Sequence, residues 1–244
     1  MIQVENLHKS FGKVKALTSV SFTASNGQIT GLLGPNGAGK TTCLRILYTL
    51  LHPDQGWAKI DGFDTIKDTQ EVQRHIGALP DSHGLYPRLT TRENIRYYGQ
   101  LHGLNGEELE KRTDRLIQLL DMQDIELRRT DGFSSGQRVK VAIARALVHQ
   151  PQNVLLDEPT NGLDVMSTRS MRDFIRSLRD EGKCVLLSSH IMQEISALCD
   201  QIVILNRGEV VASGTPENIL SKTGKTNLED AFVAAIGSEE GLER

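Results

Sequence analysis

Residues 34–42 read GPNGAGKTT and lie between the apolar run ITGLL and the run CLRILYTLL. The spacing G-x-x-x-x-G-K-T between a strand and a helix is typical of a phosphate-binding loop. Glycines let successive backbone N–H groups point at one oxyanion, and the helix N-terminus adds the positive end of its dipole. An ordinary glycine-rich turn is the alternative, which the flanking strand and helix disfavour. The loop residues predicted to bind a nucleotide are Gly34, Pro35, Asn36, Gly37, Ala38, Gly39, Lys40, Thr41 and Thr42.

The acidic pair of NVLLDEP (153–159) supplies what a phosphate loop needs for catalysis. Lys40 is expected to reach the β- and γ-phosphates, and Thr41 and Asp157 to hold Mg²⁺. Glu158 is the expected general base for a water molecule. A solvated acidic pair at a strand end is the ordinary alternative, but this pair follows an apolar strand in a chain that carries a phosphate loop. His190 ends the run VLLSSH, and we predict that it contacts the γ-phosphate, although a lone histidine is usually structural.

A second segment, FSSGQ at residues 133–137, also has the features of an anion site. A helix is expected to start near Ser135, with free N–H groups and the Ser134 hydroxyl at its N-terminus. A simple helix cap is the alternative. A second set of donors is useful if it covers the exposed γ-phosphate from another subunit. The residues assigned to this contact are Ser134, Ser135, Gly136 and Gln137.

The order of strand and helix patterns predicts an α/β protein. Short strands are expected over residues 1–33, with a hairpin turn at Asn26-Gly27, and a strand and turn over residues 57–63. The apolar runs 154–156 and 184–187 flank a helical pattern that ends at Gly182, which predicts a β-α-β unit with parallel strands. The buried face of this helix is expected to hold Met171, Phe174, Ile175 and Leu178.

Helical patterns fill the middle and the end of the chain. Thr90 and Glu93 fit a capping box, and Asn105 and Glu108 fit a second helix start. Residues 201–213 predict a hairpin that turns at Arg207-Gly208, and a helical tail is expected from Thr215 onward. The apolar face of the second helix is expected to hold Leu109, Leu116, Leu119 and Leu120.

Composition restricts the possible partners. The net charge is −3 and aromatic residues are 5% of the chain, which argues against nucleic-acid binding. The three cysteines, Cys43, Cys184 and Cys199, share no metal-ligand spacing, so reduced thiols in a cytosolic protein are expected. No secretory signal or membrane span of about 18 apolar residues is present. Action at a membrane would therefore need another chain to cross it.

The four motifs GPNGAGKTT, FSSGQRVKVAIARAL, NVLLDEPTNGLD and SSH, in this order, resemble the ATP-binding subunit of an ABC transporter. The resemblance implies a P-loop NTPase (RecA-like) core with a largely parallel sheet, an N-terminal antiparallel β-subdomain and an inserted helical subdomain. The expected domains are residues 1–215, with the helical subdomain at about 82–150, and a tail at 216–244. Two subunits of this family dimerise head-to-tail, and the signature motif of one covers the ATP bound to the phosphate loop of the other.

The same resemblance assigns further residues. Phe11 matches the aromatic that stacks on adenine, and residues 161–164 match the loop that links the two sites across the dimer. Asp81 stands where the family usually has a glutamine that touches Mg²⁺ and reports to the membrane subunit. In the segment that follows, Leu85 and Tyr86 are candidate contacts to that subunit or buried core residues. The signature is usually LSGGQ, whereas this chain has Phe133 and Ser135 at two of its positions.

The variant motifs and the tail LEDAFVAAIG resemble exporter ATPases of the sodium-exporting Nat type. The expected protein is an ATP hydrolase that uses ATP and Mg²⁺, pairs with a second copy and an integral-membrane permease, and sits on the cytoplasmic face of the membrane. Export of a drug, lipid or polysaccharide is the main alternative. A soluble ATPase acting on ribosomes or DNA, or a module that binds ATP without hydrolysis, fits less well.

Overall fold

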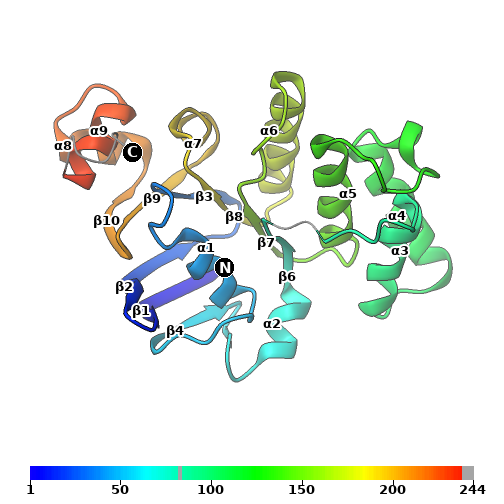
Figure 1. Cartoon of the computed structure of the whole chain (residues 1–244), viewed down its shortest axis with the longest axis horizontal. Coiled ribbons are helices and arrows are strands. Elements are labelled where there is room, and N and C mark those ends of the chain that lie inside the picture. The colour runs from blue at the N-terminus through cyan, green and yellow to red at the C-terminus, as the bar shows by residue number, and fades with distance from the viewer. Residues whose placement is uncertain (82–83, 238–244) are drawn as a thin grey trace.

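A computed structural model describes residues 1–81 and 84–237. Within these residues, ten strands form one mixed sheet in the order β5-β4-β1-β2-β10-β9-β3-β8-β7-β6. Figure 1 shows this sheet in the middle of the molecule, with helices α3, α4 and α5 together at one end and α8 and α9 near the opposite end. The α/β class predicted from the sequence is confirmed.

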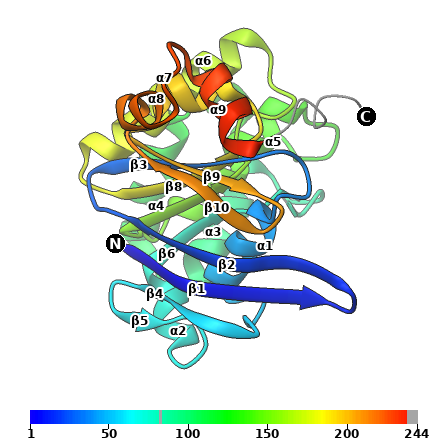
Figure 2. The same cartoon turned by 90° about the vertical axis from the view of Figure 1, so that its left-hand side faces the viewer.

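The N-terminal part of the sheet is antiparallel. Strand β1 (Ile2–Phe11) pairs with β2 (Val14–Ala24) on one side and with β4 (Gln55–Ile60) on the other, and β5 (Phe63–Asp64) completes this edge. Figure 2 shows β1 and β2 as a long ribbon that reaches to one side of the molecule. The strand and turn predicted over residues 57–63 are present.

The hairpin predicted at Asn26-Gly27 is wrong, although the chain does turn there. Strand β2 pairs with β1 and β10, whereas β3 (Gln28–Leu33) lies parallel to β8 and β9 in the middle of the sheet. The Gly27 N–H donates instead to the carbonyls of Gly182 and Lys183, at 3.1 and 2.9 Å. The Asn-Gly pair fixes the local turn, but the almost fully buried β3 finds its partners elsewhere in the chain.

The parallel part of the sheet holds β3 between two later strands. It continues through β8 (Cys184–Ser189), β7 (Asn153–Asp157) and β6 (Ile76–Leu79), and α6 (Val165–Asp180) joins β7 to β8. The predicted β-α-β unit is therefore confirmed, and the buried residues of α6 include Met171, Phe174, Ile175 and Leu178 as expected. All residues of β7 and β8 are buried, as strands covered on both faces require.

The remaining strands form the predicted hairpin. Strands β9 (Gln201–Asn206) and β10 (Glu209–Gly214) pair antiparallel, and the turn between them has positive φ at Arg207 (49°) and Gly208 (83°). Two left-handed residues give the turn type that suits the twist of a two-residue hairpin. A side chain at position 208 would also come within 2.8 Å of the Ala16 carbonyl oxygen, so glycine is needed there.

Helices cover the sheet and fill the segment between β6 and β7. The capping box between Thr90 and Glu93 is present at the start of α3, with N···O distances of 3.2 and 2.8 Å. Asn105 precedes α4 but makes no side-chain cap. The other helices are α1 (Lys40–Leu47), α2 (Thr69–His75), α3 (Thr91–Leu101), α4 (Gly106–Leu119), the 3-10 helix η1 (Gln123–Ile125), α5 (Ser135–Leu147) and α7 (Met192–Leu198).

One residue of the predicted apolar face of α4 is misplaced. Leu109, Leu116 and Leu120 are buried, but Leu119 is 43% exposed. At about 100° per residue, Leu109, Leu116 and Leu120 point within about 40° of one another, whereas Leu119 points about 60–100° away from them. The contacts of α4 with α3 and α5 favour Leu120.

The tail beyond Thr215 is helical in the described part. Helices α8 (Pro216–Thr223) and α9 (Leu228–Ile236) each begin with a side-chain cap, from Thr215 and Asn227 respectively. Residues 238–244 of the predicted tail lie outside the described residues, as do residues 82 and 83 of the predicted helical subdomain.

The three cysteines are free and buried. Among the described residues, no helix is both long and apolar enough to cross a bilayer.

Candidate active site

The phosphate loop joins the end of β3 to the start of α1, and its glycines are required by geometry. Gly37 and Gly39 have φ of 81° and 106°. A side chain on Gly39 would lie 2.6 Å from the Ala16 carbonyl oxygen, and one on Gly34 would lie 2.3 Å from that of Leu205. The loop is therefore packed tightly against the β2 and β9 segments, which leaves its other side to face a ligand.

Lys40 is the first residue of α1 and is buried. Its Nζ donates to the carbonyls of Gly34 (2.7 Å) and Pro35 (3.2 Å) and lies 3.7 Å from Glu158 Oε1. Burial lowers the pKa of Lys40, while the nearby carboxylates of Glu158 and Asp157 oppose this shift. An ammonium group held in a buried loop, with carbonyl partners that it can exchange for phosphate oxygens, suits nucleotide binding.

Asp157 ends β7 and is 1% exposed. Its Oδ1 accepts from Ser188 Oγ at 2.5 Å and from Thr41 Oγ1 at 3.5 Å. Burial raises the pKa of Asp157, and the two hydroxyl donors oppose that shift. A buried carboxylate beside a hydroxyl oxygen is the oxygen-rich donor set that Mg²⁺ prefers, so the residues present fit that ion.

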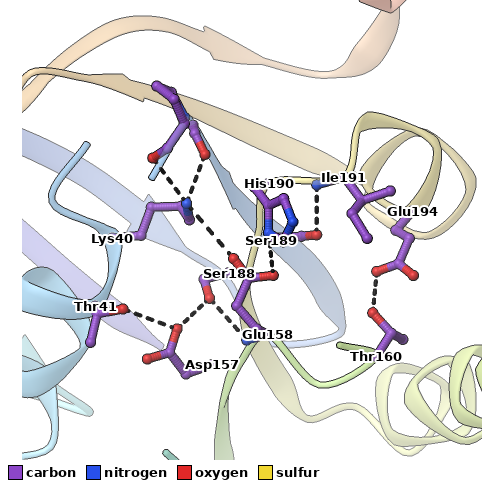
Figure 3. Close-up of polar contacts among 12 residues, drawn as sticks. Lys40, Thr41, Asp157, Glu158, Thr160, Ser188, Ser189, His190, Ile191 and Glu194 are labelled. Carbon is purple, nitrogen blue, oxygen red and sulfur yellow. Dashed lines mark hydrogen bonds and ion pairs between the residues drawn. The ribbon is translucent and has the colours of Figure 1, made fainter. Parts of the chain in front are cut away.

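Glu158 follows directly, with a left-handed backbone (φ 49°) that turns its side chain into the site. Its N–H donates to Ser188 Oγ at 3.0 Å, and its Oε2 lies 3.0 Å from His190 Nδ1. Figure 3 shows Lys40, Glu158 and His190 converging from α1, the end of β7 and the end of β8. Strain of this kind at a non-glycine residue is common where a catalytic side chain must be aimed.

These side chains line one cavity of about 590 Å³ at the carboxyl ends of β3, β7 and β8, which is where ligands bind in parallel sheets. Phe11, which is 48% exposed, contributes to its wall from the end of β1. Asp81 lies in the same cavity, and its charge helps to raise the pKa of Asp157. The other lining residues are Val14, Lys15, Ala16, Asn36, Gly37, Ala38, Gly39, Lys40, Thr41, Thr42, Asp157, Glu158, Asn161 and His190.

The FSSGQ segment lies apart from this cavity. Ser134 caps α5 by accepting from the Gln137 N–H at 3.3 Å, and Gln137 Oε1 accepts from the Ser134 N–H at 3.1 Å. Phe133 is buried, and the Arg128 guanidinium lies over its ring at 5.4 Å. In the described part of the chain, residues 133–137 line no part of the nucleotide cavity. Both the helix start near Ser135 and its capping hydroxyl are as predicted.

Three residues that hold the site together, Ser188, Thr160 and Glu194, were not predicted from the sequence. Ser188 holds both acidic residues, since it donates to Asp157 and accepts from the Glu158 N–H. Thr160 donates to the buried carboxylate of Glu194 in α7, which ties the loop after Glu158 to the helix after His190. The two serines that precede the strand-end histidine in SSH are the sequence feature that pointed to Ser188.

Comparison with known proteins agrees with the fold and the site. A family model described as ABC transporter matches residues 17–161. The chain belongs to the ABC transporter family, and it is an ATP-binding subunit that hydrolyses ATP.

Among its relatives, the chain is similar to the ABC transporter ATP-binding protein NatA of Bacillus subtilis (strain 168), with 46% identity over 91% of each chain. It is 33% identical to the linearmycin resistance ATP-binding protein LnrL of the same organism, over 98% of this chain and 79% of the relative. Its fold matches a dimeric post-hydrolysis structure of the ATP-binding cassette MJ0796 bound to ADP and Pi, with a TM-score of 0.80, 28% identity, and coverage of 88% of this chain and 98% of that one.

Proposed function

We propose that this chain binds MgATP and hydrolyses it at the interface of a head-to-tail homodimer, and that the cycle drives a separate membrane subunit. The observation that best supports this proposal is that the two parts of the site lie apart within one chain. The residues for binding and hydrolysis share one cavity, whereas the helix N-terminus at Ser134 lies outside it. A second copy related by a two-fold axis supplies that helix start to the open side of the nucleotide.

Each group of proposed site residues has its own role in binding ATP and Mg²⁺. The loop from Gly34 to Thr42 cradles the phosphates with its N–H groups, Lys40 contacts the β- and γ-phosphates, and Phe11 stacks on the adenine. Across the interface, Ser134, Ser135, Gly136 and Gln137 of the second copy cover the γ-phosphate. Thr41, Asp157 and Asp81 would hold Mg²⁺, which neutralises developing charge on phosphate oxygens when bound.

Hydrolysis follows from the position of Glu158. Its carboxylate accepts a proton from the attacking water, and His190 holds one carboxylate oxygen in place while its ring also faces the γ-phosphate. A positioned base contributes roughly 10²–10⁴-fold to the rate. ATP stabilises the closed dimer because it binds both halves, at about 2.7 kcal/mol per site at 100 times its dissociation constant. Hydrolysis removes that stabilisation, so the dimer reopens and moves the membrane subunit.

A second cavity supports a contact to that subunit. It measures about 660 Å³ and lies on the predicted helical subdomain, with Tyr86 and Tyr97 packed edge to face across it. Tyr86 is 46% exposed, whereas Leu85 packs against the core. We place the docking helix of the permease on Tyr86, with the chain at the cytoplasmic face of the membrane. The division into a 1–215 ATP-binding domain and a 216–244 tail is part of this proposal.

For the cargo, we propose sodium ions, which the motif resemblance to the Nat type and the 46% identity to NatA support. Export of a drug is the second candidate, which the similarity to the linearmycin resistance protein LnrL favours. Reconstitution with its permease in vesicles that enclose both sodium and ATP tests the choice. We expect ATP-dependent loss of internal sodium, and ATPase stimulation by an amphipathic drug with no sodium movement would favour the second candidate.

The dimer is tested with purified Glu158→Gln protein, which traps ATP. Light scattering with MgATP should give twice the monomer mass, and the mass should return to that of the monomer once nucleotide is removed. An unchanged mass at saturating MgATP would count against the head-to-tail arrangement.

A further inference from the structure

A third cavity, distinct from the one beside Tyr86, shares a wall with the nucleotide site. It measures about 610 Å³, and residues 36–38 and His190 line both cavities. Its far side is apolar: Ile191 and Met192 come from the start of α7, and Phe232, Val233 and Ile236 come from α9. The C-terminal helix therefore extends the nucleotide site with an apolar hollow.

The position of α9 is fixed relative to the phosphate loop. Asn206 Nδ2 donates to the Ile236 carbonyl at the end of α9 at 3.2 Å. Two residues later, the Gly208 N–H donates to the Ala38 carbonyl of the phosphate loop at 3.0 Å. Helix α9 also packs against α7, which follows His190, and Figure 1 shows both helices on the same side of the sheet. Hydrogen bonds and helix packing within the fold therefore fix the position of the hollow.

An apolar pair with no partner stands elsewhere on the same chain. Val165 and Met166, the first residues of α6, are 83% and 70% exposed. Single exposed apolar residues are common on protein surfaces, but two adjacent ones directly after the loop 161–164 make a small apolar knob.

Two contacts tie this knob to the nucleotide interface. A Cβ on Gly162 would lie 3.4 Å from Ser135 Oγ, so the loop 161–164 lies beside the Ser134 helix start. Asn161 lines its own nucleotide cavity together with Glu158 and His190. The proposed dimer places the Ser134 helix start of one copy over the nucleotide cavity of the other, so the loop 161–164 beside that helix start also faces this cavity, of which His190 forms one side. That is the side where the apolar hollow begins.

We propose that Val165 and Met166 of a second copy occupy the apolar hollow between α7 and α9, so that the C-terminal helix forms part of the ATP-dependent dimer interface. This inference rests on the proposed head-to-tail dimer. It gives α9 a role in subunit association next to the nucleotide, and it explains why an apolar knob follows the loop 161–164.

Cross-linking tests the contact. A Met166→Cys/Gln193→Cys chain in the Glu158→Gln background is treated with a short bis-maleimide, with and without MgATP. Both positions are exposed, and Gln193 lines the hollow, whereas the native thiols are buried. The matched control is Leu127→Cys/Gln193→Cys, because Leu127 is 75% exposed and lines neither the nucleotide cavity nor the apolar hollow. We expect a covalent dimer with MgATP from the first chain only.

The possible results distinguish a failure of this contact from a failure of the proposed ATPase dimer on which it rests. An MgATP-dependent dimer in light scattering that gives no covalent dimer, or that cross-links equally from Leu127, would overturn the contact and leave the ATPase dimer intact. No MgATP-dependent dimer at all would overturn both.

A second variant measures the strength of the contact. Val165→Ser/Met166→Ser should raise the dimer dissociation constant in MgATP at least tenfold, with the melting temperature of the monomer unchanged, because both side chains are exposed in the monomer. Leu127→Ser is the control and should leave dimerisation unchanged. Equal dimerisation of the Val165/Met166 variant and the parent chain would refute the proposal.

Discussion

His190 Nδ1 lies 3.0 Å from Glu158 Oε2, while Lys40 Nζ lies 3.7 Å from the other carboxylate oxygen of Glu158. An ionised carboxylate can only accept hydrogen bonds, so the proton of this contact belongs to His190 Nδ1. The general base is therefore held from two sides before any nucleotide arrives. Because the three residues come from different elements, the strand order of the sheet sets this geometry.

The first prediction concerns the base itself. Glu158→Gln keeps the size and the hydrogen-bonding oxygen of the side chain but cannot take a proton, so phosphate release should fall by about 10²–10⁴-fold. ATP binding, measured by fluorescence titration with a nucleotide analogue, should stay within severalfold of the parent. Glu107→Gln, on an 82% exposed side chain, is the control. Normal turnover by Glu158→Gln would mean that another group activates the water.

The second prediction uses the burial of Asp157. Its pKa is raised by burial, so between the ordinary value of 3.8 and the raised value the native state binds a proton more tightly than the unfolded chain does. Stability from this group is therefore lost as pH rises through that window, because the buried carboxyl then ionises. Asp157→Asn keeps an acceptor for Ser188 and Thr41.

We expect the Asp157→Asn protein to be more stable by about 1 kcal/mol at pH 7.5 without nucleotide, a rise of roughly 2–4 °C in melting temperature. The gain should shrink as pH falls toward 3.8, the ordinary pKa of an aspartate, and Mg²⁺-dependent hydrolysis should be lost. Differential scanning fluorimetry at pH 7.5 and at lower pH checks this. A variant less stable than the parent at pH 7.5 would show that Lys40 and the two hydroxyls fully compensate the charge.

The third prediction concerns Asp81, which lies in the nucleotide cavity, at the position to which the motif resemblance assigns a glutamine. A carboxylate binds Mg²⁺ more strongly than an amide oxygen does. Asp81→Gln should therefore raise the free Mg²⁺ needed for half-maximal ATPase activity severalfold, with little change in the maximal rate. Titration of Mg²⁺ at fixed ATP measures this, and Asp131→Asn serves as a control outside the cavity. The same half-maximal concentration in both variants would remove Asp81 from the metal site.

Local patterns predicted much of this fold. The phosphate loop, the β-α-β unit, the Arg207-Gly208 turn and the Thr90 capping box each depend on residues close in sequence, where spacing alone carries the information. The Asn26-Gly27 hairpin failed because the choice of strand partner depends on burial of β3 among strands more than 150 residues later. Leu119 failed because it lies about 60–100° around the helix from Leu109, Leu116 and Leu120, outside the buried face.

In the functional site, too, residues within local motifs were predicted, whereas residues defined by long-range contacts were not. The residues of the phosphate loop and the acidic pair were predicted from motifs, and the structure brings residues 36–42 and the acidic pair into one cavity, whereas Gly34 and Pro35 do not line it. Ser188 and Glu194 were missed: the SSH run was the one clue to Ser188, and the buried Glu194 has no distinctive spacing of its own. Their roles appear only once β8 and α7 lie beside the acidic pair. The apolar hollow under α9 likewise depends on contacts between distant segments.

The last prediction concerns a stacked histidine pair where the helical segment meets the sheet. The rings of His102 and His149 are parallel, with centroids 3.7 Å apart, and His149 Nε2 donates to the Ile76 carbonyl at 2.9 Å. Burial, helped by the charges of His102, Arg112 and Lys183, lowers the pKa of His149 from 6.5 to about 4. The bond to Ile76 opposes this shift.

Between pH 6.5 and about 4, the unfolded chain therefore binds a proton at His149 that the native state does not bind. Stability falls as pH decreases through this window, by up to about 3 kcal/mol at its lower end. His149→Gln keeps a donor for Ile76 and cannot titrate, so urea unfolding at pH 7, 5.5 and 4.5 should show a shallower loss than in the parent. His52→Gln, at an exposed position, should follow the parent. If His149→Gln also follows the parent, another group is responsible for the acid sensitivity, because removing the titrating ring must flatten the slope that it causes.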